Sequence, residues 1–68
     1  MAERLGNHLR EARAARGWTQ ADLAQRVGVT RKTINTVENG VFIPSTVLAL
    51  KLASALGSTV ESLFELYG

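Results

Sequence analysis

Five polar side chains that can hydrogen-bond to nucleic acid fall on one side of a predicted helix near the centre of the chain. They are Arg31, Lys32, Asn35, Thr36 and Asn39. At about 100° per residue they span about 140° of the helix circumference, and the apolar Ile34 and Val37 fall on the other side. Guanidinium, ammonium, amide and hydroxyl groups are those that proteins use to contact base edges and phosphates. The pattern indicates a helix with one buried side and one side suited to DNA.

The flanking sequence predicts how this helix is positioned. The stretch 20–40, QADLAQRVGVTRKTINTVENG, has a helical apolar pattern on each side of Gly28. Gly28 tolerates the positive φ that ends a helix, and the hydroxyl of Thr30 can cap the next one. A short turn remains between two short helices, with Val29 filling the angle between them. This arrangement predicts a helix-turn-helix.

The chain resembles the Cro/repressor-type (XRE-like) helix-turn-helix family of bacterial and phage DNA-binding regulators. The matching segments are TQADLAQRVGV, TRKTINTVENG, PSTVLALKLASALG and VESLF, which together extend from Leu9 to Phe64. The resemblance implies a homodimeric transcriptional regulator, a repressor, that binds double-stranded DNA at a near-palindromic operator. Its half-sites would lie about one DNA turn apart.

We expect the exposed side of the second motif helix to read bases through Arg31, Lys32 and Thr36, with Asn35 as a fourth candidate. A cation at position 31 or 32 suits guanine O6 and N7, and the amide of Asn35 suits adenine.

Phosphate contacts are expected on the neighbouring helices. The resemblance assigns them to Gln20 and Asn39, with Thr19 and Arg13 as further candidates. Gln20 opens a helix, where its backbone N–H and its side-chain amide can meet a phosphate. The resemblance also implies a partly exposed ion pair between Arg13 and Glu38 that orients the arginine toward the DNA backbone.

The composition limits the other classes of function. The 68 residues predict a single domain, 1–68, and their net charge of +2 is unevenly spread, since residues 4–32 carry every basic residue except Lys51. One histidine and no cysteine provide neither a catalytic constellation nor a metal site, so we expect no enzyme activity and no cofactor. No apolar run is long enough to cross a membrane, and no small-molecule ligand is evident. We expect a cytoplasmic, nucleoid-associated protein.

The fold class expected is all-α, a compact five-helix lambda-repressor-like bundle. Three glycine–x–threonine joints and one extended connection over 41–44 separate five expected helices. These are a first helix over 2–16, the two motif helices, an apolar helix over 46–56 and a last helix from Val60. Helix 46–56 is apolar almost all round, which predicts the most covered position. Trp18 is expected in the core. The apolar run 41–43 either folds back onto the core or forms part of a partner surface.

The homodimer is expected to use the back of the domain, because two half-sites multiply the specificity of one recognition helix. The residues expected at its interface are Glu61, Ser62, Leu66, Tyr67 and Phe42.

Three alternatives remain open. An antitoxin of a toxin–antitoxin pair and a restriction–modification controller use the same fold. A protein-interaction module without DNA binding is the third, although the basic and amide groups of the recognition helix favour DNA.

Overall fold

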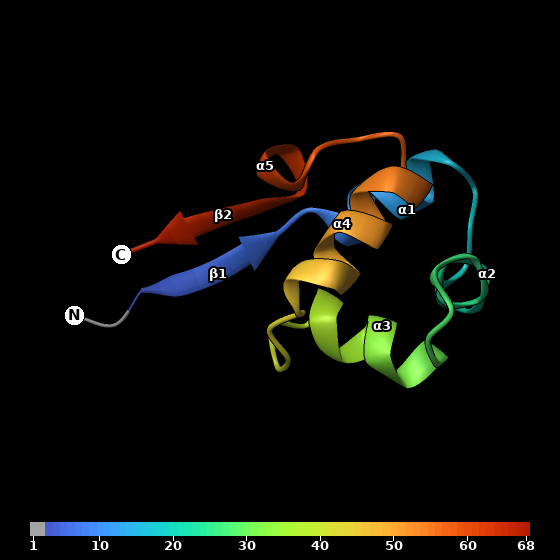
Figure 1. Cartoon of the computed structure of the whole chain (residues 1–68), viewed down its shortest axis with the longest axis horizontal. Helices are drawn as coiled ribbons and strands as arrows, with labels where there is room; N and C mark the ends of the chain where they lie inside the picture. Colours follow the sequence, from blue (N-terminus) through green and yellow to red (C-terminus); the bar gives the residue numbers. More distant parts are fainter. Residues whose placement is uncertain (1–2) are drawn as a thin grey trace.

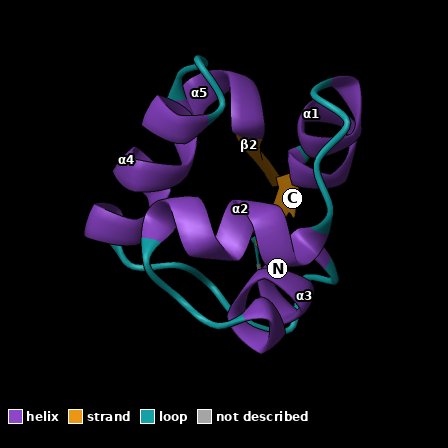
Figure 2. Ribbon diagram, turned by 90° about the vertical axis from the view of Figure 1, so that its right-hand side faces the viewer, coloured by secondary structure: helices purple, strands orange, loops and turns teal. Residues whose placement is uncertain are grey.

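The computed structural model describes residues 3–68 and contains five short helices and one pair of strands (Figure 1). In chain order the elements are β1 (Arg4–Asn7), α1 (Leu9–Ala15), α2 (Gln20–Val27), α3 (Arg31–Glu38), α4 (Thr46–Ala55), α5 (Val60–Leu63) and β2 (Phe64–Tyr67). The helix-turn-helix predicted from the glycine and threonine pattern is α2 and α3. Figure 2 shows α2 crossing over α3, the helix on which the exposed polar residues lie.

The predicted threonine caps and the glycine stop at Gly28 are confirmed. The hydroxyls of Thr19, Thr30 and Thr59 each accept a hydrogen bond from the backbone N–H three residues later. Gly28 ends α2 with a φ of 74°, a left-handed conformation that favours glycine. A local side chain therefore satisfies one of the free N–H groups at the start of each of α2, α3 and α5.

Among residues 3–68, a cluster of twelve buried apolar side chains joins α1 to β2, and seven half-buried ones pack against it. Its fully buried members are Leu9, Leu23, Ile34, Leu52, Leu63 and Val37. Because α2 and α3 both contribute to this cluster, their mutual orientation is set by the same core that holds the other helices.

The all-α prediction is wrong at both ends of the chain. Residues 4–7, expected in a first helix over 2–16, form β1, which pairs antiparallel with β2; the expected helix start at residue 2 lies outside the described residues. The last helix likewise stops at Leu63, and Phe64 begins β2. Helical periodicity could not reveal this pairing, because each strand receives its hydrogen-bond partners from the opposite end of the chain.

Helix α4 is less covered than its composition suggested. Its buried side is limited to Leu48, Leu52 and Ala53, whereas Val47 is 63% exposed and Leu50 is 57% exposed. The prediction of a helix covered on every side was therefore wrong. Among the described elements, α2 and α5 are the main neighbours of α4, and the side of α4 that carries Val47 and Leu50 faces solvent.

The solvent exposure of Trp18 and of the run 41–43 tests two further predictions from the sequence. Trp18 is half-buried rather than wholly in the core, and the guanidinium of Arg26 lies 4.0 Å from the centroid of its ring. The apolar run 41–43 does not fold back into the core, because Val41 is 78% exposed and Ile43 is 72% exposed.

The sheet carries a close contact between Gly6 and Tyr67. A Cβ atom at position 6 would collide with the ring of Tyr67, whose hydroxyl donates a 2.7 Å hydrogen bond to Glu65 on the same strand. The ring thus covers a glycine on the adjacent strand, where a larger residue does not fit.

We expect the effect of Gly6→Ala on stability to depend on residue 67. With Tyr67→Ala in place, alanine should stabilise the strand by about 0.5–1 kcal/mol, because glycine loses more backbone entropy on folding. In the parent this gain should be offset by about 1 kcal/mol for displacing the ring. Denaturant unfolding of the parent, both single variants and the double variant measures this coupling, and additive effects would show that the contact carries no energy.

Candidate nucleic-acid interface

The outer side of α3 presents the candidate base-reading residues together. Arg31, Lys32 and Asn35 are exposed, and Ile34 and Val37 on the other side are fully buried. Thr36 is half-buried, and its hydroxyl donates a 3.0 Å hydrogen bond to the carbonyl of Thr33 within the same helix. Asn35 donates a 3.4 Å hydrogen bond to Gln20, so Arg31 and Lys32 carry the freest polar groups on this surface.

A buried carboxylate lies behind that surface. The side chain of Glu38 has no solvent exposure, and Arg13 donates to it from Nε at 2.8 Å and from Nη2 at 3.2 Å. Gln20 donates from Nε2 at 3.1 Å, and Arg10 Nε lies 3.7 Å away. The predicted Arg13–Glu38 ion pair is confirmed, but it is far less exposed than expected, since Arg13 is also only 14% exposed.

These partners determine the charge state of Glu38. Burial alone raises the pKa of Glu38, but hydrogen bonds from Arg13 and Gln20 outweigh it and hold the pKa below its ordinary value. The pKa of Arg13 is raised by its hydrogen bond to Glu38. The pair is therefore ionised at neutral pH and links α1 to the last residue of α3.

Of the four candidate phosphate-binding residues, Arg13 belongs to this ion pair and Gln20 hydrogen-bonds to it. Both polar atoms of the Gln20 side chain have protein partners, Glu38 and Asn35. Arg13 also donates to the carbonyl of Trp18 at 2.9 Å, which leaves its guanidinium committed to the protein. The hydroxyl of Thr19 caps α2.

Asn39 is hydrogen-bonded to Arg10, a residue that was not predicted from the sequence to lie at this surface. Its Nδ2 donates to the carbonyl of Asn35 at 2.9 Å, and its Oδ1 accepts from Arg10 Nη2 at 3.3 Å. Arg10 is 62% exposed and lies three residues before Arg13 on α1. That spacing puts both arginines on one helix side, and this was the signal that could have identified Arg10.

The expected dimer residues lie on two elements and one loop. Leu66 is 68% exposed and Tyr67 is 48% exposed on β2, and Phe42 is 48% exposed in the loop after α3. Ser62 instead takes part in the cap of α5, where its hydroxyl accepts from Thr59.

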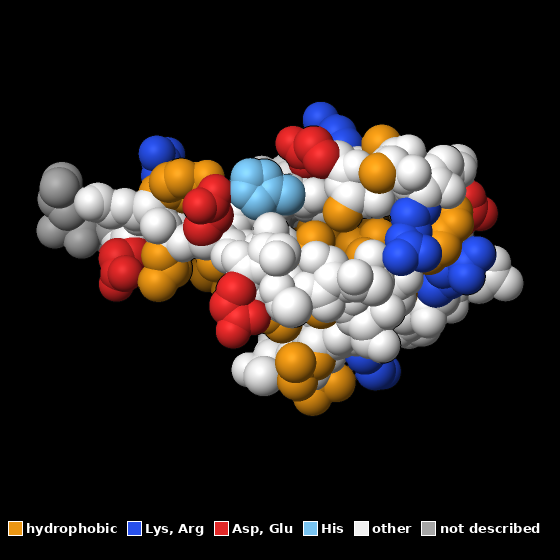
Figure 3. All heavy atoms as spheres, turned by 90° about the horizontal axis from the view of Figure 1, so that it is seen from above, with side chains coloured by type: hydrophobic (Ala, Val, Ile, Leu, Met, Phe, Trp, Pro, Cys, Tyr) orange, Lys and Arg blue, Asp and Glu red, His pale blue; other side chains and the backbone are white. Residues whose placement is uncertain are grey.

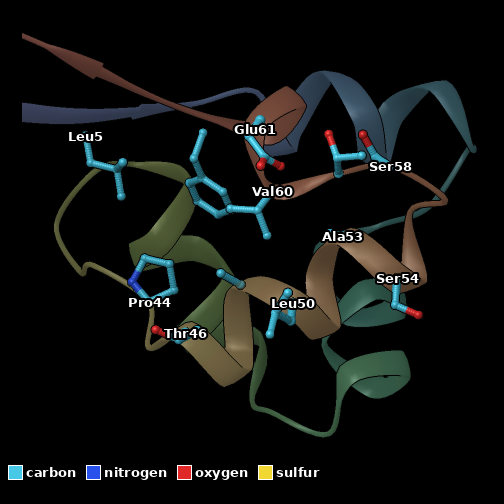
Figure 4. Close-up of a pocket in the computed structure, with 12 residues that line it drawn as sticks. Leu5, Pro44, Thr46, Leu50, Ala53, Ser54, Ser58, Val60 and Glu61 are labelled. Atoms are coloured by element: carbon cyan, nitrogen blue, oxygen red, sulfur yellow. The ribbon is translucent and has the colours of Figure 1, made fainter.

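Glu61 borders an open apolar groove of about 660 Å³ between β1, α4 and α5 (Figure 4). The side chains of Leu5, Leu50 and Val60 line it, on three different elements. The groove was not predicted, because it depends on how far apart these elements pack.

Charge is spread unevenly over the surface. On the face drawn in Figure 3, several Lys and Arg side chains gather at the end of the molecule away from the sheet. This end includes α1 and α2, whereas α3 lies on the far side of the molecule in this view.

The chain is similar to known helix-turn-helix proteins. The profile of the helix-turn-helix family matches residues 9–63. The chain belongs to the XRE-type helix-turn-helix family of transcriptional regulators. It is 42% identical over 58 residues to an uncharacterized HTH-type transcriptional regulator, YgzD, of Bacillus subtilis, covering 85% of this chain and 88% of that protein. A second HTH-type regulator, from Methanothermobacter thermautotrophicus, is 49% identical over 57 residues, covering 82% of this chain and 83% of that protein.

A solved structure supports the same family. The restriction-modification controller protein C.AhdI from Aeromonas hydrophila superposes with a TM-score of 0.75 at 41% identity, covering 79% of this chain and 82% of that one. The XRE-type family match includes α1 to α5, while β1 and β2 lie outside residues 9–63. Among residues 3–68 there is no helix with the length and apolar character needed to cross a membrane.

We expect the Arg13–Glu38 pair to stabilise the fold by more than a surface pair. A double-mutant cycle with Arg13→Ala and Glu38→Ala should give a coupling energy of about 1–3 kcal/mol at pH 7, because both side chains are covered. The folded-state pKa of Glu38 lies below the ordinary value of 4.5. The coupling should therefore be complete above that pH and be lost as the pH falls through the folded-state pKa.

Denaturant unfolding at neutral and acidic pH measures this coupling. The control is a cycle between Arg13→Ala and Glu11→Ala, since residues two apart on a helix do not face each other. Equal coupling in the two cycles, or coupling that survives protonation of the carboxylate, would contradict the assignment.

Proposed function

We propose that residues 1–68 act as one DNA-binding domain that recognises a specific duplex sequence as a homodimeric transcriptional regulator. The proposal rests on the two different sides of α3. Arg31, Lys32 and Asn35 are exposed on one side, and Ile34 and Val37 are buried on the other. In this proposal α3 enters the major groove with its N-terminal end, so that the two cations reach base edges first. Family membership supports the same mode of binding.

The base contacts follow from the donors available. Arg31 or Lys32 contacts guanine O6 and N7, and Asn35 contacts adenine. Thr36 contributes through its methyl group, because its hydroxyl donates within the helix. The XRE-type relatives and the exposed amide and basic groups favour this function over a protein-interaction module.

Phosphates flank these contacts on both sides. The backbone N–H of Gln20 lies in the first turn of α2, where helix N–H groups have no partner within the helix. On the other flank, Arg10 and Asn39 form an exposed pair that can hold a phosphate oxygen. Thr19 and Arg13 act mainly by capping α2 and by orienting Glu38.

The homodimer uses the apolar groove between β1, α4 and α5. Its rim includes Glu61, and further exposed apolar surface comes from Leu66 and Tyr67 on β2 and from Phe42 in the loop after α3. A two-fold dimer through this surface presents two α3 helices to one near-palindromic operator. In this proposal the dimer acts as a repressor on the nucleoid.

A second role is control of a restriction–modification gene pair. The 41% identity with the controller C.AhdI supports it. The DNA interface is the same in both roles, and the operator selected from a random duplex pool, compared with the chromosome, distinguishes them.

We expect the two cations of α3 to determine the selected sequence. Arg31→Ala or Lys32→Ala should cost about 1–3 kcal/mol on the preferred operator and relax the preference at one or two base pairs. If the removed cation also neutralises a phosphate, the slope of log K against log salt concentration should become shallower by about one for that variant.

Selection from a random duplex pool, followed by a salt series on the selected operator, measures both effects. Lys51→Ala, which removes the same charge from α4 on another surface, is the control and should leave the selected bases intact. If Lys51→Ala alters the bases and the α3 variants do not, the recognition helix has been misassigned.

We expect the dimer to depend on the apolar groove. Leu50→Glu should weaken dimerisation about tenfold or more, because it places an unpaired charge in the buried interface. Sedimentation with and without operator DNA measures the subunit number, and Gln25→Glu on α2 is the matched charge control. A parent protein that stays monomeric on its operator, with one copy per site, would refute the dimer.

A further inference from the structure

The side-chain amide of Gln20 has a fixed orientation. The buried carboxylate of Glu38 can only accept hydrogen bonds when ionised, so the group that Gln20 turns toward it must be Nε2, at 3.1 Å. Arg13 holds the carboxylate in place with two further hydrogen bonds. The oxygen Oε1 of Gln20 therefore points away from Glu38.

That oxygen faces the exposed side of α3. Gln20 Oε1 accepts a hydrogen bond from Asn35 Nδ2 at 3.4 Å. Because a carbonyl oxygen cannot donate, Asn35 must turn its NH2 group, and not Oδ1, toward Gln20. Asn35 is exposed, and its Oδ1 and second N–H have no partner among the described residues.

We propose that Gln20 is a positioning residue that sets Asn35 to recognise adenine and reject guanine. The proposal rests on the proposed DNA-binding function and refines it. Adenine presents an acceptor at N7 and a donor at N6 in the major groove, which match the remaining N–H and Oδ1 of Asn35. Guanine presents two acceptors, N7 and O6, so Oδ1 would face an acceptor. An amide without the Gln20 contact can turn over and donate to guanine.

The two roles of Gln20 can be separated by mutation. Its phosphate contact uses the backbone N–H, which every substitution except proline retains. Gln20→Met keeps the length of the side chain and removes both of its hydrogen bonds. Gln20→Ala also removes both hydrogen bonds but shortens the side chain, so it cannot clash with its neighbours. Gln25→Met on the exposed surface of α2 is a matched control, because the Gln25 side chain has no hydrogen bond among the described residues.

The first measurement uses the free protein and needs no DNA. In a ¹⁵N-labelled sample, the Nδ2 protons of Asn35 should shift toward the values of a solvated asparagine amide in Gln20→Met and in Gln20→Ala. Gln25→Met should leave them in place. An Asn35 signal that is unchanged by both substitutions at position 20 would overturn the proposal.

The second measurement uses the selected operator and its variant with guanine in place of the adenine assigned to Asn35. The preference for adenine should fall about tenfold in Gln20→Met, or about 1.4 kcal/mol, while preferences at other positions stay the same. In an Asn35→Ala background, Gln20→Met should have no further effect on this preference. Uniform weakening of all duplexes, or an Asn35→Ala variant with the parent's base preferences, would overturn the proposal.

The two arms distinguish this inference from the proposed function. A parent protein without any sequence preference would refute the proposed function and with it the adenine contact. The amide spectrum would still decide whether Gln20 orients Asn35.

Discussion

The burial of the Glu38 carboxylate is the constraint on which the candidate DNA surface depends. Taking an ionised group out of water costs several kcal/mol unless donors replace the lost solvation. Here α1 supplies Arg13 and Arg10, and α2 supplies Gln20. No buried side-chain nitrogen or oxygen in the described part of the chain lacks a partner. The carboxylate thus ties three helices together at the end of α3.

This polar cluster acts together with the apolar core. The core alone would hold α3 through Ile34 and Val37, but apolar contacts are not directional and tolerate small rotations. Hydrogen bonds to Glu38 have preferred distances and angles. They limit the rotation of α3 about its axis, and that rotation decides which side chains face outward.

The small sheet and the groove belong to the opposite end of the molecule. Pairing β1 with β2 brings both ends of the described chain together, and the backbone N–H of His8 donates to the carbonyl of Leu63 at 2.8 Å. Leu5 on β1 and Phe64 on β2 then line the groove beside α4. The apolar surface proposed for dimerisation is consequently built from segments far apart in the sequence, while the base-reading groups come from one continuous helix.

That difference explains what the sequence by itself determined. The caps at Thr19 and Thr30, the turn at Gly28 and the two sides of α3 depend on interactions within a few residues, which residue type and spacing specify. The resemblance to a known family added the partner of Glu38. Together these were sufficient to predict the helix-turn-helix and its candidate base-reading residues.

Only the tertiary structure decided how the ends of the chain fold and which polar groups remain free. The strands over 4–7 and 64–67 depend on backbone pairing between distant segments, so the local pattern of Leu5 and Leu9 suggested a helix instead. The exposure of Leu50 depends on the absence of a covering element in the described chain. Gln20 hydrogen-bonds to Glu38 and Asn35, and Arg10 hydrogen-bonds to Asn39. These contacts form only because the packing of α1, α2 and α3 brings their side chains together.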